Sequence, residues 1–276
     1  RASHATRKHT FTSLLALATQ QPLRPAHLKH FLPTPAAGLA INSALALAGV
    51  LAQQKVLTNQ GLVHAYALGL LLYAAIGPSG WALCVAYLAL GSTVTKLKMA
   101  QKEALGIAEA RGGRRGPENV WGSAAVGAVC ALGLVAFPQL KTQWLVGYVA
   151  SLATKLSDTC ASEVGKAYGR TTYLITTFRR VPAGTEGAVS LEGTAAGIVG
   201  SLVLAALGVT ADLITPVHVL PCVLAAFLAN NVESLIGASA QGRQGFGWLT
   251  NELVNVINCL IGALAAVTLC VLQGLA

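Results

Sequence analysis

Eight apolar stretches, separated by short polar connections, constrain the fold of this chain more than any other feature. They lie at residues 38–52, 62–76, 81–94, 120–137, 144–156, 189–208, 217–236 and 253–275. A helix needs about 20 apolar residues to cross the core of a bilayer, so the shorter stretches are expected to form tilted or broken helices. The pattern predicts an all-α fold, a polytopic integral membrane helical bundle with about seven or eight transmembrane helices.

The composition excludes a large soluble domain. Of the 276 residues, 54% are hydrophobic and only 11% are charged, and the mean hydropathy is +0.61, whereas soluble domains carry far more charge. Residues 34–276 are therefore predicted to form a single membrane-embedded domain. Residues 1–33 are rich in Ser, Thr and Arg and lack acids, which is typical of an organelle transit peptide or of the chain just after one. A basic segment on the membrane surface is the alternative.

Basic residues gather on one side of the predicted bundle. If all eight stretches cross the membrane, the side of the odd-numbered connections holds thirteen of the 19 basic residues. The positive-inside tendency assigns that side to the cytoplasm or, in a plastid, to the stroma, although the five basic residues of segment 1–33 fall on the other side. The basic connection from Lys96 to Arg115 is predicted to be either a surface helix that binds anionic lipid heads or a solvated loop.

The six cysteines and six histidines do not follow metal-binding patterns. No two cysteines form a C-x-x-C pair, and the histidines are scattered. We predict that the cysteines are buried as small hydrophobic residues and that the chain holds no structural zinc.

Two carboxylates at the end of the fifth stretch, Asp158 and Glu163, are the first candidates for chemistry, because an unpaired carboxylate in a membrane is costly. Helical spacing places Lys155, Asp158 and Ser162 on one face and Glu163 on a neighbouring face. Carboxylates bind hard cations such as Mg²⁺, and Lys or Arg cations neutralise phosphoryl oxygens. The alternative is a charged helix end with internal ion pairs.

The residues that follow strengthen the phosphoryl-transfer hypothesis. Cations occur at Lys166, Arg170, Arg179 and Arg180. Pro182, Gly184 and Gly187 allow the next loop to turn tightly and bring its amides close to a phosphate.

Polar residues also interrupt the last two apolar stretches. Asn230, Asn231, Glu233 and Ser234 lie in the seventh stretch, and Asn251, Glu252, Asn255 and Asn258 lie at the start of the eighth. They are predicted either to face a common cavity with Asp158 or to form hydrogen bonds between helices. Because the chain contains no Walker A string, any nucleotide is bound without a P-loop.

Five strings resemble a known membrane family. They are DTCASEVG at 158–165, TTF at 176–178, GTEGAVSLEGT at 184–194, ESLIGA at 233–238 and TNELVN at 250–255. Their combination is similar to the family that contains transmembrane protein 19 and the phytyl-phosphate kinases of plants, algae and cyanobacteria.

The resemblance implies a kinase-like domain that converts phytyl phosphate to phytyl diphosphate in tocopherol synthesis, in a chloroplast membrane. It implies Mg²⁺ and a nucleoside triphosphate, CTP or another, as phosphate donor. The partners are then phytyl phosphate and membrane lipid, without nucleic acid, and the oligomeric state is left open.

Residue pattern and resemblance together define the candidate site. The expected catalytic residues are Asp158, Glu163, Lys166, Arg179 and Arg180, and the expected metal ligands are Asp158, Glu163 and Glu233. The expected nucleotide- and phosphate-binding residues are Lys155, Ser162, Gly165, Thr177, Gly184, Thr185, Gly187, Ser190, Asn251 and Asn255. Two alternatives stay open: a transporter or channel for ions or lipids, and a lipid cytidylyltransferase.

Overall fold

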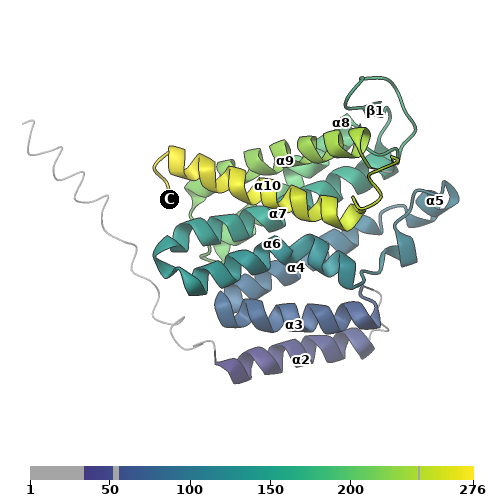
Figure 1. The fold of residues 1–276 in the computed structure, drawn as a ribbon. Coiled ribbons are helices and arrows are strands. Elements are labelled where there is room, and N and C mark those ends of the chain that lie inside the picture. Colours follow the sequence, from purple (N-terminus) through teal and green to yellow (C-terminus); the bar gives the residue numbers. More distant parts are fainter. Residues whose placement is uncertain (1–33, 52–55, 242) are drawn as a thin grey trace, which may run out of the picture. The chain divides into compact units, whose positions relative to one another are not determined.

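Long helices make up most of the structure, a computed structural model that describes residues 34–51, 56–241 and 243–276. The long helices are α2 (Pro35–Leu51), α3 (Asn59–Ala75), α4 (Pro78–Thr95), α6 (Pro117–Ala136), α7 (Lys141–Tyr168), α8 (Leu191–Thr210), α9 (Val219–Ser239) and α10 (Asn251–Leu272). They match the eight predicted stretches one for one, and the all-α bundle is confirmed (Figure 1). The predictions for residues 1–33 lie outside the described part of the chain.

Short elements join the long helices. They are α5 (Met99–Ala104), η2 (Ala110–Gly113), η3 (Pro138–Leu140) and η4 (Pro216–His218), with the antiparallel strands β1 (Tyr173–Leu174) and β2 (Ala188–Val189) between α7 and α8. Pro78 opens α4 directly after Gly77, whose φ of 92° favours glycine.

Helix α7 is the centre of the bundle and packs against α4, α6, α8, α9 and α10. Small residues permit these close contacts; at Gly147, for example, an added Cβ would lie 3.1 Å from the sulfur of Cys130. The apolar stretch was expected to end at residue 156, but the helix continues to Tyr168. The helix continues because its polar second half lies inside the bundle, where other elements supply partners for its charges.

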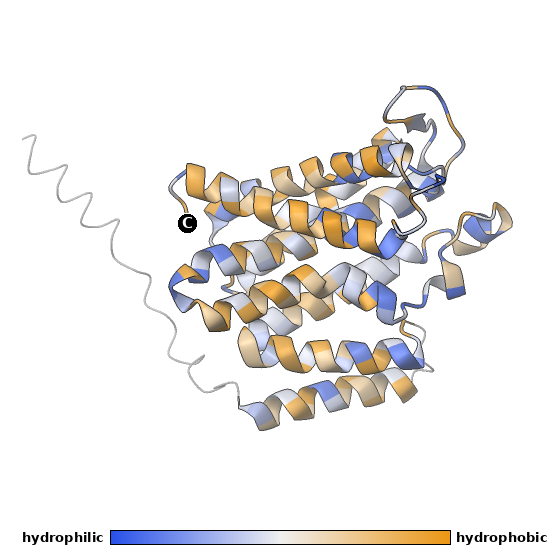
Figure 2. Cartoon of the chain, viewed as in Figure 1, coloured by the Kyte–Doolittle hydropathy of each residue, from blue (hydrophilic) through white to orange (hydrophobic). Residues whose placement is uncertain are grey.

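The outer surface of the bundle is apolar, as a lipid-facing surface must be. Helices α6, α8 and α10, and η4 with α9, are long and apolar enough to cross a bilayer. Outward-facing residues on them, such as Val129, Leu202, Leu220 and Leu264, are exposed and hydrophobic, and Figure 2 shows orange residues along these helices. The chain is an integral membrane helical protein.

The cysteines behave as predicted. Cys130, Cys160, Cys222, Cys259 and Cys270 are buried, Cys84 is partly buried, and none of the six forms a disulfide. They fill the core as small hydrophobic side chains.

One end of the bundle carries nearly all the described charge. The connections α2–α3, α4–α6, α7–α8 and α9–α10 meet at this end (Figure 1), which is where Leu57 pairs with Arg115 and Lys98 Nζ donates to the carbonyl of Ala167 at 3.1 Å. Among the described residues of the opposite end, Lys141 is the one Lys or Arg. We call the charged end the basic end, and the candidate site lies there.

Candidate active site at the basic end of the bundle

A polar cavity of about 340 Å³ opens at the basic end of the bundle. Its walls come from α7, the α4–α6 connection, the α7–α8 connection, α9 and the start of α10. The predicted residues that line it are Lys155, Asp158, Ser162, Glu163, Gly165, Lys166, Gly184, Thr185, Gly187, Ser190, Glu233, Asn251 and Asn255. The expectation that acids of three helices meet around one hollow agrees with this arrangement.

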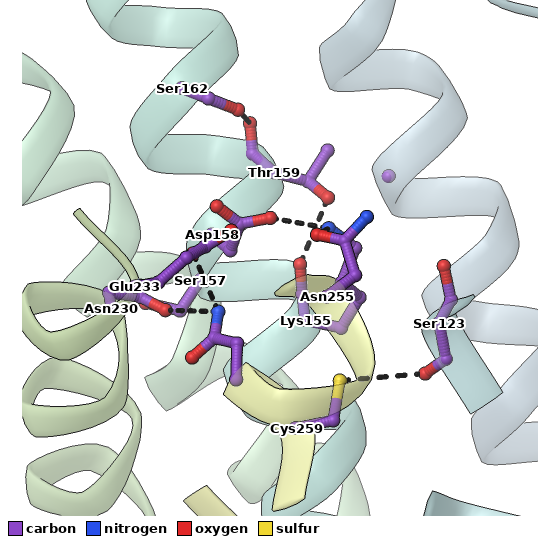
Figure 3. A network of polar contacts seen from close by, with 12 residues as sticks. Ser123, Lys155, Ser157, Asp158, Thr159, Ser162, Asn230, Glu233, Asn255 and Cys259 are labelled. Carbon is purple, nitrogen blue, oxygen red and sulfur yellow. Dashed lines mark hydrogen bonds and ion pairs between the residues drawn. The ribbon is translucent and has the colours of Figure 1, made fainter. Parts of the chain in front are cut away.

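Lys155 and Asp158 form an ion pair on one face of α7, one helical turn apart. The Lys155 Nζ atom also donates to Asn255 Oδ1 of α10 at 2.7 Å, and Thr159 Oγ1 donates to the Lys155 carbonyl at 2.9 Å. Lys155 is only 7% exposed, so the carboxylate compensates its buried charge. The bond from Lys155 to Asn255 joins α7 to α10 in the wall of the cavity (Figure 3).

The carboxyl group of Glu233 in α9 lies beside that of Asp158. Asn258 Nδ2 donates to Glu233 Oε2 at 2.7 Å and lies 3.1 Å from Asn230 Oδ1, while Asn230 Nδ2 donates to Ser157 Oγ at 2.8 Å. The sequence allowed either interhelical hydrogen bonds or a shared cavity for these polar residues. The structure shows both together. Two neighbouring carboxylates facing one lysine leave a surplus of negative charge, which favours a cation or a proton.

Glu163 lies in a different environment from the other two acids. Its Oε2 atom accepts a bond from Lys102 of α5, whose Nζ also donates to the carbonyl of Thr95 at 2.7 Å. Lys166 Nζ lies 3.6 Å from the second oxygen, Oε1. Both members of the Lys102 pair are buried, so this interaction fastens the α4–α6 connection to α7.

The proposed three-carboxylate metal site is therefore not assembled. No group of three His, Cys, Asp or Glu residues in the described part of the chain is placed to hold a metal ion. Glu163 does not join Asp158 and Glu233, because Lys102 and Lys166 hold its carboxylate on a neighbouring face of α7. Asp158 and Glu233 nevertheless fit Mg²⁺, which commonly takes one or two protein carboxylates and completes its shell with water and substrate phosphates. The neighbouring carboxyl oxygens of these two residues, which line the same cavity, are the observation that supports this fit.

The α4–α6 connection brings cations into the cavity. It was expected to be either a lipid-binding surface helix or a solvated loop. Arg111, Arg114 and Arg115 line the cavity. Arg115 Nη1 donates to the hydroxyl of Tyr87 at 2.7 Å, and Arg111 is paired with Glu118 and with Asn119 Oδ1 at 2.7 Å. A basic run immediately before the first turn of α6 is the signal that could have identified them, because helix amino termini favour anions.

The connection between α7 and α8 supplies backbone to the cavity, as expected. Gly184 and Gly187 have φ angles of 86° and 73°, a region that favours glycine. Gly187 also packs so closely against α9 that an added Cβ would lie 2.5 Å from the Ser234 carbonyl oxygen. Ser190 caps α8 by accepting from the Gly193 amide at 3.1 Å.

Three predicted residues lie elsewhere. Thr177, Arg179 and Arg180 are exposed and are not among the residues that line the cavity. They lie in the turn between β1 and β2, where Tyr173 pairs with Arg180 and Phe178 has a φ of 53°. The loop borders the cavity through Gly184 and Gly187, but its β1–β2 turn holds the two arginines outside the cavity wall, where the α4–α6 connection provides arginines instead.

A comparison with known families places the chain. The family described as Integral membrane protein DUF92 matches residues 42–263. The chain belongs to this family. Membership confirms the family expected from the five strings, and the matched region includes every residue that lines the cavity.

Relatives in the family come from distant organisms. The chain is 52% identical to "Uncharacterized membrane protein sll0875" of Synechocystis over 82% of its own length and 88% of that protein. It is 51% identical to "Protein VTE6, chloroplastic" of Arabidopsis thaliana over 76% of its own length and 64% of that protein. It is 30% identical to "Uncharacterized membrane protein MJ0933" of Methanocaldococcus jannaschii over 80% of its own length and 89% of that protein. No solved structure matches the chain.

Proposed function

We propose that this chain is a membrane isoprenoid-phosphate kinase that converts phytyl phosphate to phytyl diphosphate with a nucleoside triphosphate. The observation that carries the proposal is the composition of the cavity at the basic end. Carboxylates of Asp158 and Glu233 and cations of Lys166 and Arg114 line one space at the end of an apolar bundle. A lipid phosphate and a triphosphate need such a combination of charges at a membrane boundary.

The residues of the cavity have complementary roles in this reaction. Asp158 and Glu233 would hold Mg²⁺, which when bound neutralises phosphate charge and orients the donor. Lys166 and Arg114 would contact phosphoryl oxygens as charge builds on them. The amides near Gly184 and Gly187 add neutral donors from the backbone.

The chemical step needs positioning more than a strong base. An oxygen of the lipid phosphate attacks the γ-phosphorus, a new P–O bond forms, and the bond from the γ-phosphorus to the bridging oxygen breaks, so that the nucleoside diphosphate leaves with the electron pair. Because the attacking oxygen is already ionised, no proton has to be removed from it. The acids of the cavity therefore serve as cation ligands rather than as general bases.

The relatives support a plastid setting for this proposal. The Arabidopsis relative is named as chloroplastic, and segment 1–33 has a transit-like composition. The family resemblance connects the product, phytyl diphosphate, with tocopherol synthesis. We include a chloroplast membrane and this pathway in the proposal.

The deciding experiment incubates purified protein in detergent with phytyl phosphate, Mg²⁺ and each of several γ-labelled nucleoside triphosphates. The proposed kinase transfers the label to a lipid whose mass is that of phytyl diphosphate and leaves a nucleoside diphosphate. A cytidylyltransferase would instead release pyrophosphate and form a nucleotide-linked lipid. A transporter or channel would form no product, and either of these results would overturn the proposal.

A further inference from the structure

A second, narrower cavity leads away from the polar cavity between α8 and α9. It has a volume of about 50 Å³, and the two cavities share five wall residues, namely Ala161, Val189, Thr194, Asn230 and Ser234. We call this second cavity the lateral groove. The shared wall residues place it directly beside the cavity that holds the charged residues.

The lateral groove changes in chemistry along its length. Its inner end carries the Asn230 Nδ2 to Ser157 Oγ hydrogen bond of 2.8 Å. Its outer end carries Ile198 of α8, which is 40% exposed, and Phe227 of α9, which is 43% exposed. Asn231, whose Nδ2 donates to the Phe227 carbonyl at 2.7 Å, also lines the groove. The groove is thus polar beside the polar cavity and carries large apolar side chains at its outer end, which suits an amphiphile whose charged head lies in the polar cavity.

Glycine keeps the groove open where α8 approaches α7. Gly197 lines the groove, and an added Cβ there would lie 3.0 Å from the Ser157 carbonyl oxygen and 3.2 Å from the Ala161 Cβ. The lack of a side chain lets α8 lie close to α7 at this level, where Ser157 and Ala161 of α7 also line the groove.

The groove extends in the direction expected for a lipid substrate. On α9 its wall residues run from Ser234, at the level of the charged residues, to Phe227, which is roughly 10 Å along a helix axis. The outer surfaces of α8 and α9 beside it are apolar, with Val199 and Leu228 exposed by 58% and 53%. The groove therefore lies between the polar cavity and the lipid-facing surface.

We propose that the lateral groove binds the isoprenoid tail next to its phosphate, and that the substrate enters sideways from the bilayer between α8 and α9. This inference rests on the proposed function and specifies the tail site. The first carbon atoms of the tail lie against Ile198 and Phe227, and the remainder stays in lipid. Sideways entry keeps the tail out of water while the phosphate reaches Asp158 and Lys166, because exposure of apolar surface to water is unfavourable.

The first test is photo-cross-linking, which needs no turnover. Full-length protein in phospholipid nanodiscs is illuminated with a prenyl phosphate whose tail carries a diazirine beside the first isoprene unit, and labelled peptides are mapped by mass spectrometry. Labels on Ile198 or Phe227 that unlabelled phytyl phosphate removes support the inference. Labels confined to other helices, no label, or labels that excess phytyl phosphate does not remove, as from ordinary lipid contact, would overturn it.

The second test compares two neighbouring residues of α8. Ile198→Trp should fill the groove and lower kcat/KM for phytyl phosphate by about tenfold or more while changing that for methyl phosphate, which has no isoprenoid tail, by less than about twofold. Val199→Trp, the matched control on the lipid-facing surface, should change neither. Equal losses for both substrates, or the same effect from Val199→Trp, would contradict a tail site.

Failure of the two proposals can be distinguished. If the wild-type protein forms no diphosphate, the kinase proposal fails, but the cross-linking pattern still decides whether the groove binds a prenyl phosphate. If the kinase is active and the cross-links lie elsewhere, the tail site alone is wrong.

Discussion

The Lys155 Nζ atom of α7 lies 2.7 Å from the Asn255 Oδ1 atom of α10, although the two residues are 100 positions apart in the chain. The same lysine is paired with Asp158. One buried cation thus holds a carboxylate of the proposed site and connects two membrane helices. A substitution at this site therefore tests the chemical role apart from the structural one only when it keeps the shape of the side chain.

Asp158→Asn keeps the shape of the side chain and removes its charge. We expect kcat to fall by about 100-fold or more, because the cation ligand is lost, while the protein still inserts and elutes as wild type in size-exclusion chromatography. Glu103→Gln, at an exposed position of α5, is the matched control and should keep full activity. Normal diphosphate formation by the Asp158→Asn protein would contradict the proposed role.

The Lys102–Glu163 pair is predicted to matter for stability more than for chemistry. Glu163→Gln leaves Lys102 buried without a counter-charge, and such a change typically lowers the free energy of unfolding by about 3–5 kcal/mol. Lys102→Met should cost less, because Glu163 keeps Lys166 at 3.6 Å. The double variant should recover most of the loss, since no unpaired charge remains at full burial.

Thermal unfolding of these variants in detergent provides the measurement. Glu118→Gln is the control, because the Arg111–Glu118 pair is about two-fifths exposed and exposed pairs contribute at most about 1 kcal/mol. Equal midpoints for the Glu163→Gln and Glu118→Gln proteins would show that the buried pair is not a stabilising connection.

Substitutions of two arginines test which connection binds the nucleotide. Arg114 lines the cavity, and Arg179 lies outside it. We expect Arg114→Gln to raise the KM for the nucleoside triphosphate by about tenfold, the loss of one charged contact to phosphate, and Arg179→Gln to leave it unchanged. The opposite pattern in steady-state kinetics would mean that the β1–β2 turn, and not the α4–α6 connection, binds the nucleotide.

Gly187 is predicted to hold the α7–α8 connection against α9. Gly187→Ala adds both a strained positive φ of 73° and a clash with the Ser234 carbonyl oxygen at 2.5 Å, so we expect lower thermal stability and lower activity. Gly245→Ala is the matched control, because Gly245 has a φ of 90° and nothing within 4 Å of an added Cβ. It should show only the cost of backbone strain, on the order of 1 kcal/mol. Similar losses in both variants would remove the argument for close packing at Gly187.

Much of this protein could be predicted from its sequence alone. The apolar stretches identified every long helix, and the strings around Asp158, Gly187, Glu233 and Asn255 identified most of the cavity wall. These features are accessible to sequence reasoning because hydropathy, helical spacing and glycine conformation depend on residues close together in the chain.

Only the tertiary structure decided how the charges are distributed among partners. Glu163 is paired with Lys102, 61 residues away, Arg114 faces the cavity, and Arg179 does not. Each of these residues had several plausible partners of suitable charge. The partner that each residue takes depends on which distant segments pack together and bury its charge. The free-energy cost of leaving a buried charge unpaired arises only once the helices have assembled.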